Sequence, residues 1–364
     1  MSLTVVQLVP NLEMGGVERG TVEFACYLKQ QGYRAIVISG GGRLVADLSA
    51  QGIEHIVMDI GKKSLFTLRL IPQLKQQLMA CQADIVHARS RLPAWLAYQA
   101  LKKQPRPPYF ITTLHGLHSV NRYASVMARG DAVIAVSETA KAYLQNHFSR
   151  YLKAPPKVIY RGVDEQQFRF GHQPNKQWLA ELESRFPALI NKQKVLVPGR
   201  LTAGKGFENI IPWLQQADHN QCLLVTAEPQ HSNYTRRMAE QLQQQQLSDR
   251  VFWIGPQTQM ADLYAYADLT VSVNRKPESF GRTVLESLTV GTPVVGLNQG
   301  GVAEVLSELF IEGLVELDQP QQLINKINQF LTEPATVTPQ NSFSNEQQFA
   351  QTIALYKNLM AGNL

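Results

Sequence analysis

The chain has 364 residues, of which 44% are hydrophobic and 18% charged, which is ordinary for a folded protein. This length exceeds what one hydrophobic core usually serves, so two domains are expected. No apolar run approaches the roughly 18 residues of a membrane span, and the first residues lack the basic region of a signal peptide. The three scattered cysteines fit a reducing compartment and no structural zinc, which predicts a cytoplasmic protein.

The net charge of +6 is distributed unevenly. Residues 1–165 carry 20 basic and 11 acidic side chains, a net charge of +9, whereas residues 166–364 carry 15 and 18, a net charge of −3. A basic half joined to a slightly acidic half predicts an anionic partner for the first half. Scattered solvated lysines and arginines would give the same totals, and nucleic acid is not the partner that we expect.

Short β-branched runs alternate with helical patterns through the first half. Near-continuous apolar strands of this kind are typical of parallel sheets that are buried on both faces. The runs predict strands at 3–9, 34–39, 55–60, 84–88, 109–114 and 132–137. They indicate a doubly wound, Rossmann-like α/β domain over residues 1–165, which would bind ligands at the carboxyl ends of its strands.

A glycine-rich turn, Gly15-Gly16, follows the first predicted strand. It differs from the dinucleotide fingerprint G-x-G-x-x-G, and the second strand ends in SGGGR rather than in an acidic residue. A nicotinamide dehydrogenase is therefore disfavoured. The turn instead predicts a nest of backbone N–H groups that opens a helix, which suits a phosphate or a closely approaching sugar.

Residues 166–193 are polar and irregular apart from one predicted helix, which indicates a linker region. A second series of apolar runs predicts a second doubly wound domain over residues 194–342, facing the first across a cleft. Its strands are expected at 194–199, 221–227, 250–255, 269–274, 292–297 and 313–317. The tail, 343–364, predicts a helix over 344–360 that packs back toward the N-terminal domain, with Ser344 as N-cap.

The turn after the strand 194–199, GRLTAGKG, carries two cations, Arg200 and Lys205. It fits G-x-x-x-x-G-K, but Gly206 stands where a P-loop needs Ser or Thr for Mg²⁺. A P-loop-like nucleotide hydrolase is thus an alternative that lacks its metal hydroxyl. Arg200 and Lys205 together would neutralise a diphosphate directly. An ordinary turn with solvated basic residues is the simpler interpretation.

The stretch PESFGRTVLESLTVGTPVVG, residues 277–296, holds two glutamates eight positions apart. Ser279 is predicted to cap a helix that ends at Gly291. Glu278 would lie just before this helix and Glu286 two turns inside it, roughly 12 Å apart along the axis. A retaining hydrolase pair needs about 5 Å. The predicted separation instead matches the length of a nucleotide diphosphate sugar.

The start of this helix is a candidate seat for a diphosphate, because its first N–H groups and its positive dipole end attract anions. Gly281 would let the backbone approach a ligand closely. Glu286 would then accept hydrogen bonds from ribose hydroxyls, and Glu278 from sugar hydroxyls. Two surface glutamates beside an ordinary helix start would leave the same pattern in the sequence.

Together these motifs resemble the retaining glycosyltransferases of family 4, the "group 1" family with the GT-B fold, over nearly the whole chain. The most specific match is E-x-F-G-x-x-x-x-E, formed by Glu278, Phe280, Gly281 and Glu286. Further matches are Arg200 and Lys205 in GRLTAGKGFE, Gly15-Gly16 in EMGGVERG, His115 in TLHG, Ser137 in AVSE and residues 162–164 in YRGVD. DIVHARSRLPAW and YRGVD are most similar to bacterial members that build lipopolysaccharide or other envelope glycans, although several members have Asn at the position of Arg161.

The resemblance implies a role for each matched position. Arg200 and Lys205 would hold the donor diphosphate, and Glu286 would bind the ribose. Glu278 would hold the donor sugar, and His115 would lie next to the reacting sugar. The implied donor-binding set is Gly15 and Gly16 from the first domain, with Arg200, Lys205, Glu278, Ser279, Phe280, Gly281, Thr283 and Glu286 from the second. The implied catalytic set is Glu278, His115, Arg200 and Lys205.

The implied reaction moves a sugar from a nucleotide diphosphate sugar to a hydroxyl of a glycan or lipid-linked acceptor, with retention of configuration, by front-face attack or through a covalent intermediate. Stabilising the leaving diphosphate is the largest contribution available to the protein. No D-x-D motif is present, Glu316-x-Asp318 being the nearest, so neither a metal nor another cofactor is expected. A nucleotide-sugar epimerase of the same fold, a nucleotide hydrolase and a non-catalytic glycan-binding module are the alternatives.

Two segments of the basic half suit peripheral binding to an anionic membrane face. In residues 61–70, GKKSLFTLRL, the cations Lys62, Lys63 and Arg69 surround Leu65, Phe66 and Leu68. In residues 101–108, LKKQPRPP, the further cations are Lys102, Lys103 and Arg106. If the three apolar residues are instead buried, the first segment is an ordinary helix with solvated lysines.

Overall fold

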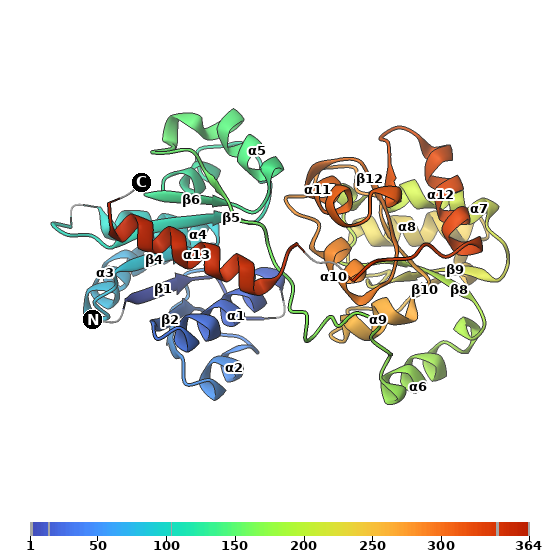
Figure 1. The fold of residues 1–364 in the computed structure, drawn as a ribbon, viewed down its shortest axis with the longest axis horizontal. Coiled ribbons are helices and arrows are strands. Elements are labelled where there is room, and N and C mark those ends of the chain that lie inside the picture. The colour runs from blue at the N-terminus through green and yellow to red at the C-terminus, as the bar shows by residue number, and fades with distance from the viewer. Residues whose placement is uncertain (1–2, 14, 103, 340–341, 363–364) are drawn as a thin grey trace. The chain divides into compact units, whose positions relative to one another are not determined.

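The structure, a computed structural model, describes residues 3–13, 15–102, 104–339 and 342–362, without the side chain of Leu65. The chain divides into two compact units (Figure 1). One consists of Met1–Tyr160 and Glu346–Leu364, and the other of Arg161–Asn345. The segment 166–193, expected to be a linker, is grouped with the second unit.

The first unit contains a seven-stranded parallel sheet with the strand order β3-β2-β1-β4-β5-β6-β7. Its strands are β1 (Thr4–Leu8), β2 (Arg34–Ser39), β3 (Glu54–Val57), β4 (Ile85–Ala88), β5 (Tyr109–Leu114), β6 (Ala132–Ala135) and β7 (Lys157–Val158). Chain order reverses between β1 and β4, so the sheet is doubly wound and its switch point lies between these two strands.

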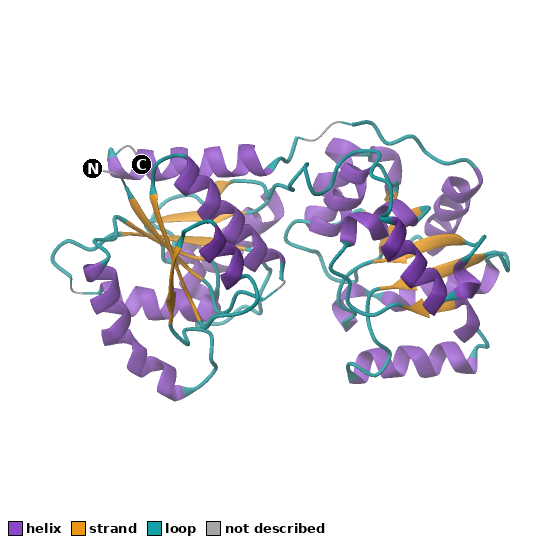
Figure 2. Cartoon of the chain, turned by 90° about the horizontal axis from the view of Figure 1, so that it is seen from below, coloured by secondary structure: helices purple, strands orange, loops and turns teal. Residues whose placement is uncertain are grey.

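Helices cover both faces of this sheet (Figure 2). The α-helices are α1 (Gly16–Gln30), α2 (Val45–Ala50), α3 (Leu70–Ala80), α4 (Arg91–Leu101), α5 (Glu138–Phe148) and the C-terminal α13 (Asn345–Met360). The 3₁₀ helices are η1 (Leu65–Arg69), η2 (Ala124–Ala128) and η3 (Ser149–Tyr151).

Helix α13 completes the core of the first unit. The rings of Phe349 and Phe24 have centroids 5.2 Å apart. Tyr356 is fully buried, and its hydroxyl lies 2.6 Å from Nδ1 of His87, whose Nε2 lies 2.6 Å from the hydroxyl of Thr113. His87 is therefore a satisfied core histidine, and this buried polar chain ties the last helix to β4 and β5.

The second unit contains a six-stranded parallel sheet with the order β10-β9-β8-β11-β12-β13 and its switch point between β8 and β11. The strands are β8 (Gln193–Val197), β9 (Gln221–Val225), β10 (Val251–Trp253), β11 (Leu269–Ser272), β12 (Val294–Leu297) and β13 (Leu314–Val315). The α-helices are α6 (Lys176–Arg185), α7 (Ile211–Gln216), α8 (Asn233–Gln244), α9 (Met260–Tyr266), α10 (Arg282–Val290), α11 (Gly300–Leu309) and α12 (Pro320–Thr332). The 3₁₀ helices are η4 (Pro187–Leu189), η5 (Ala203–Lys205), η6 (Phe207–Ile210), η7 (Ser248–Arg250) and η8 (Ile311–Gly313).

The predicted fold class, two doubly wound α/β units, is confirmed. All twelve predicted strands are present, and their ends differ from the predicted ends by at most three residues. The two-residue strand β7 was not predicted, because it is too short to leave an apolar run. The predicted end of α10 at Gly291 is also confirmed, with Gly291 as a left-handed C-cap at φ +104°.

Within the described residues, every helix is too short or too polar to cross a membrane.

Candidate active site

The candidate site of the second unit is built from two loops that leave β8 and β11, the strands on either side of the switch point. The backbone N–H groups of Arg275 and Lys276 donate to the carbonyl oxygen of Gly204 at 3.0 and 3.2 Å. Gly206 adopts φ +62°, and a Cβ there would lie 2.4 Å from the carbonyl oxygen of Val273. The glycine therefore allows the two loops to pack backbone against backbone.

An ion pair joins the two loops. Nζ of Lys205, on the β8 loop, contacts Oε1 of Glu278, on the β11 loop. Asn274 Nδ2 donates to the same oxygen at 2.7 Å. The Lys205 and Glu278 side chains are 30% and 23% exposed, so their attraction is screened less than that of a surface pair. The structure thus brings together two residues for which the sequence predicts contacts with different parts of one ligand, the diphosphate for Lys205 and the sugar for Glu278.

Arg200 lies on the β8 loop, five positions before Lys205. Its side chain is exposed, and no described residue forms an ion pair or a side-chain hydrogen bond with it. A guanidinium presents five donors in a planar fork that matches the oxygens of a phosphate. Arg200 therefore has its full hydrogen-bonding capacity available to a ligand, whereas Lys205 already has a carboxylate partner.

The prediction that Ser279 caps helix α10 is wrong. The N-cap is Gly281, in the left-handed region at φ +85°, and the helix begins at Arg282. A Cβ at Gly281 would lie 3.0 Å from the Cα of Val302, so the turn and the close packing both favour glycine. Glu278 consequently lies outside the helix by four residues, and the separation of roughly 12 Å along one helix axis does not apply.

The β11 loop also packs closely against the first turn of α11. The N–H of Gly301 donates to the carbonyl oxygen of Glu278 at 2.9 Å, and a Cβ at Gly301 would lie 2.2 Å from the Cα of Phe280. The Phe280 side chain is buried. Sequence reasoning missed Gly301, although the pair Gly300-Gly301 begins three positions after the end of a predicted strand, in a loop where a close backbone approach is common.

Glu286 is buried inside α10, and two donors hold its carboxylate. Tyr264 donates to Oε2 at 3.0 Å, and Arg282 Nε donates to Oε1 at 2.7 Å. Burial and the Glu286 carboxylate raise the pKa of the Tyr264 hydroxyl well above its usual range, so it remains a donor. The sequence analysis missed both donors. The i,i+4 spacing of Arg282 and Glu286 was an available signal, but nothing in the sequence pairs Tyr264 with a residue 22 positions away.

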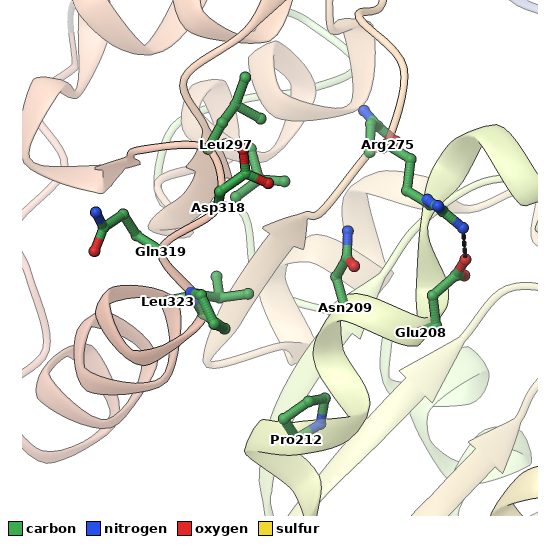
Figure 3. Close-up of a pocket in the computed structure, with 11 residues that line it drawn as sticks. Glu208, Asn209, Pro212, Arg275, Leu297, Asp318, Gln319 and Leu323 are labelled. Atoms are coloured by element: carbon green, nitrogen blue, oxygen red, sulfur yellow. Dashed lines mark hydrogen bonds and ion pairs between the residues drawn. The ribbon is translucent and has the colours of Figure 1, made fainter.

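A cavity of about 620 Å³ lies next to these loops, at the carboxyl ends of β11, β12 and β13 (Figure 3). Asp318 and Leu297 lie on one wall, and Asn209 and Arg275 lie on the other. The predicted site residues are not among its lining residues. Asn274 connects this cavity with the candidate site, because it also lines a small cavity of about 10 Å³ with the predicted site residues Lys205 and Thr283. Hydrogen bonds and ion pairs, rather than cavity size, therefore define the candidate site.

The predicted site residues of the first unit lie at the carboxyl edge of its sheet. Gly15 is the N-cap of α1, which confirms that the glycine turn opens a helix. The N–H of Gly15 already donates to Glu18 Oε2 at 2.8 Å, so a phosphate would have to displace that carboxylate. His115 directly follows β5 and is half-buried. Among the described residues, no group of three His, Cys, Asp or Glu side chains is placed to hold a metal ion.

Family models match both parts of the chain. The model described as Glycosyltransferase Family 4 matches residues 14–167, and the model described as Glycosyl transferases group 1 matches residues 181–348. One relative is the lipopolysaccharide core biosynthesis mannosyltransferase of Rhizobium meliloti (strain 1021), which is 25% identical over 65% of this chain and 68% of its own length.

Two solved structures share the fold. A glycosyltransferase from Rickettsia africae ESF-5 is 28% identical and covers 99% of both chains with a TM-score of 0.83. The Anabaena protein HepE, solved in complex with UDP-glucose, is 22% identical and covers 97% of this chain and 100% of its own, with a TM-score of 0.78. The two family models together span nearly the whole chain, and the fold agrees with them: the chain belongs to the group 1 glycosyltransferases of the GT-B fold.

Proposed function

We propose that the protein transfers a sugar from a nucleotide diphosphate sugar to an acceptor hydroxyl, with retention of the anomeric configuration. The observation that supports this proposal is the Lys205–Glu278 pair, in which a cation able to bind phosphate lies beside a carboxylate able to accept hydrogen bonds from hydroxyls. Family membership supports the transfer. The UDP-glucose bound to HepE supports a nucleotide-sugar donor.

Binding of the donor would separate this ion pair and give each of its two residues a new partner. Its diphosphate takes up Lys205 and Arg200, and Glu278 is then released to accept hydrogen bonds from hydroxyls of the donor sugar. Glu286, oriented by Tyr264 and Arg282, accepts from the ribose with its remaining lone pairs. The two cations and the first turn of α10 stabilise the negative charge that develops on the leaving diphosphate.

Retention follows if the acceptor attacks the face that the diphosphate leaves. The bond from the anomeric carbon to the phosphate oxygen breaks, the bond to the acceptor oxygen forms, and a phosphate oxygen takes the acceptor proton. His115 would lie beside the reacting sugar. We propose that no metal takes part, because Arg200 and Lys205 supply the positive charge that a metal ion would otherwise place on the diphosphate.

The acceptor that we propose is a lipopolysaccharide or another envelope glycan, in line with the Rhizobium meliloti relative. An anionic membrane face would then be a partner of η1. The interpretation of its apolar residues as core is wrong for Phe66 and Leu68, whose side chains are 68% and 53% exposed. Lys62, Lys63 and Arg69 are also exposed. The side chain of Leu65 and the whole of Lys103 lie outside the described part of the chain.

A panel of UDP-, GDP-, ADP- and TDP-sugars tests the donor class by thermal stabilisation. A ligand at 100 times its Kd stabilises a protein by about 2.7 kcal/mol, which is a measurable shift in Tm. One nucleotide sugar should shift the Tm more than its free sugar does, and the shift should shrink in the Lys205→Ala variant. Stabilisation by ATP with Mg²⁺ alone would favour the nucleotide hydrolase instead.

A further inference from the structure

A cationic and aromatic cluster lies at the carboxyl edge of the first sheet, and the site described above does not use it. Arg91 is the first residue of α4, three positions after the end of β4, and its side chain is half-buried. The β5 strand next to it continues into the loop that holds His118 and Tyr123. The switch point between β1 and β4, where doubly wound sheets bind ligands, adjoins this place.

The cluster is held in place from two sides. The guanidinium carbon of Arg91 lies 5.1 Å from the ring centroid of Tyr123. Trp95, one turn further along α4, donates from Nε1 to the carbonyl oxygen of Tyr123 at 2.7 Å. Tyr143, on α5, donates its hydroxyl to the carbonyl oxygen of His118. The loop after β5 is therefore tied to α4 at Tyr123 and to α5 at His118.

The positive charge of Arg91 has no carboxylate partner among the described residues. The first turn of α4 contains no acidic residue. Burial, and then Arg91, lower the pKa of His118 to about 4, so this histidine is neutral near pH 7. A partly buried charge gains more from a counter-charge than an exposed one does, because water screens the attraction less. In the second unit, by contrast, Arg282 is paired with Glu286 at 2.7 Å.

The contact with Tyr123 holds the guanidinium near the ring, and no described residue accepts a hydrogen bond from its N–H donors. A guanidinium presents these donors in a planar fork that can bind two oxygens of a phosphate or a carboxylate at once. A cation–aromatic contact attracts the guanidinium to the ring but supplies no counter-charge. It therefore stabilises the orientation of Arg91 without neutralising its charge.

We infer that Arg91 is the anion-binding residue of the acceptor site and that the acceptor carries a phosphate or carboxylate group, which Arg91 binds against the Tyr123 ring. This inference rests on the proposed transfer function and narrows its acceptor to an oxyanion-bearing molecule. Arg91 acts by positioning the acceptor and makes no bond to the reacting atoms.

His118 provides a local reporter for the test. The full-length protein is titrated with sodium phosphate and, separately, with sodium glucuronate at constant ionic strength, and the His118 ring resonances are followed by NMR. They are assigned from the His118→Asn variant. We expect a saturable shift with phosphate, glucuronate or both, and a bound anion should raise the pKa of His118. The Arg91→Gln variant should bind about tenfold more weakly or worse.

The matched control is Arg150→Gln, which removes an exposed arginine of the first unit that lies over the ring of Tyr151 and should leave the titration unchanged. A shift with phosphate alone identifies a phosphorylated acceptor, and one with glucuronate alone a carboxylated acceptor. The inference is overturned if neither anion gives a saturable shift in the wild type, or if Arg91→Gln binds as tightly as the wild type. Donor binding in the second unit is measured separately. A failure to bind any donor would refute the proposed function and would leave the result of the anion titration unchanged.

Discussion

The two units share one architecture but differ in how they pair the charges at the carboxyl edge. In the second unit Lys205 is paired with Glu278, Arg282 with Glu286 and Arg275 with Glu208, and Arg200 has no described partner. In the first unit Arg91 lies over the ring of Tyr123 and has no described carboxylate partner. The two halves of the sequence differ in the same direction, because residues 1–165 carry a net charge of +9 and residues 166–364 a net charge of −3.

This difference separates two kinds of ligand. A paired site suits a ligand that carries both anionic oxygens and hydroxyl groups, because such a ligand can satisfy the cation and the carboxylate together. The charge of an unpaired cation is neutralised only by an anion. We therefore associate the second unit with the nucleotide diphosphate sugar and the first with an anionic acceptor.

Removing a cation from the second unit should have the largest effect. Lys205→Ala or Arg200→Ala should lower kcat by about 10²-fold or more, because both cations act on charge that develops in the transition state. Steady-state kinetics with the identified donor measure this loss. Lys276→Ala, on the β11 loop, removes an exposed lysine and is the control. Unchanged turnover in both variants, with a native fold, would remove the two residues from the mechanism.

Removing the carboxylates one at a time should sharpen the assignment within the second unit. Glu286→Ala should weaken binding of the free nucleotide diphosphate by roughly 1.5–3 kcal/mol, the value of a charge-assisted hydrogen bond. Glu278→Ala should not weaken it, because that carboxylate serves the sugar. Calorimetry with the nucleotide alone separates the two. An equal loss in both variants would show that the ribose and sugar are placed wrongly.

The first unit should respond to pH through its buried histidine. Burial, and then Arg89, lower the pKa of His87 well below its usual value, so the unfolded chain binds the proton more readily. The stability that neutral His87 contributes is present above the unfolded pKa of about 6.5 and is lost as the pH falls below it, by up to about 1.4 kcal/mol per pH unit. Denaturant unfolding between pH 7 and pH 5 should show a slope of this sign, and His87→Gln should reduce it, the remainder coming from His118, whose pKa is also lowered. An identical slope in the variant would refute the assignment.

The smallest effect concerns the exposed segment η1. Changing Lys62 and Lys63 to Glu should weaken co-sedimentation with anionic liposomes, at about 1 kcal/mol per basic residue near the surface. Binding by the wild type should rise with anionic lipid and fall with salt. The control replaces Lys176 and Lys357, which are also exposed. A wild-type protein that stays in the supernatant at low salt would make a soluble acceptor the better proposal.

The strands were predictable because buried parallel strands leave continuous apolar runs, and the pattern E-x-F-G-x-x-x-x-E marked the loop that holds Glu278 and the helix that holds Glu286. The cap of α10 was missed because a left-handed glycine, Gly281, replaces the side-chain cap that Ser279 offers. Tyr264 was missed because its contact with Glu286 depends on the packing of α9 against α10 and on no local spacing. The exposure of Phe66 and Leu68, on which the membrane interpretation depends, is confirmed, although so short a 3₁₀ helix has no periodicity that could have excluded their burial.

The most direct test of the account is a product analysis with the donor found in the panel and an envelope glycan fraction as acceptor. We predict equal amounts of released nucleotide diphosphate and new glycoside, with the anomeric configuration of the donor by NMR. Activity should remain within a small factor after EDTA and fall by about 10²-fold in Lys205→Ala. Nucleotide release without sugar incorporation, conversion of the donor without acceptor, or activity that is abolished by EDTA and restored by Mg²⁺ or Mn²⁺ would contradict the account.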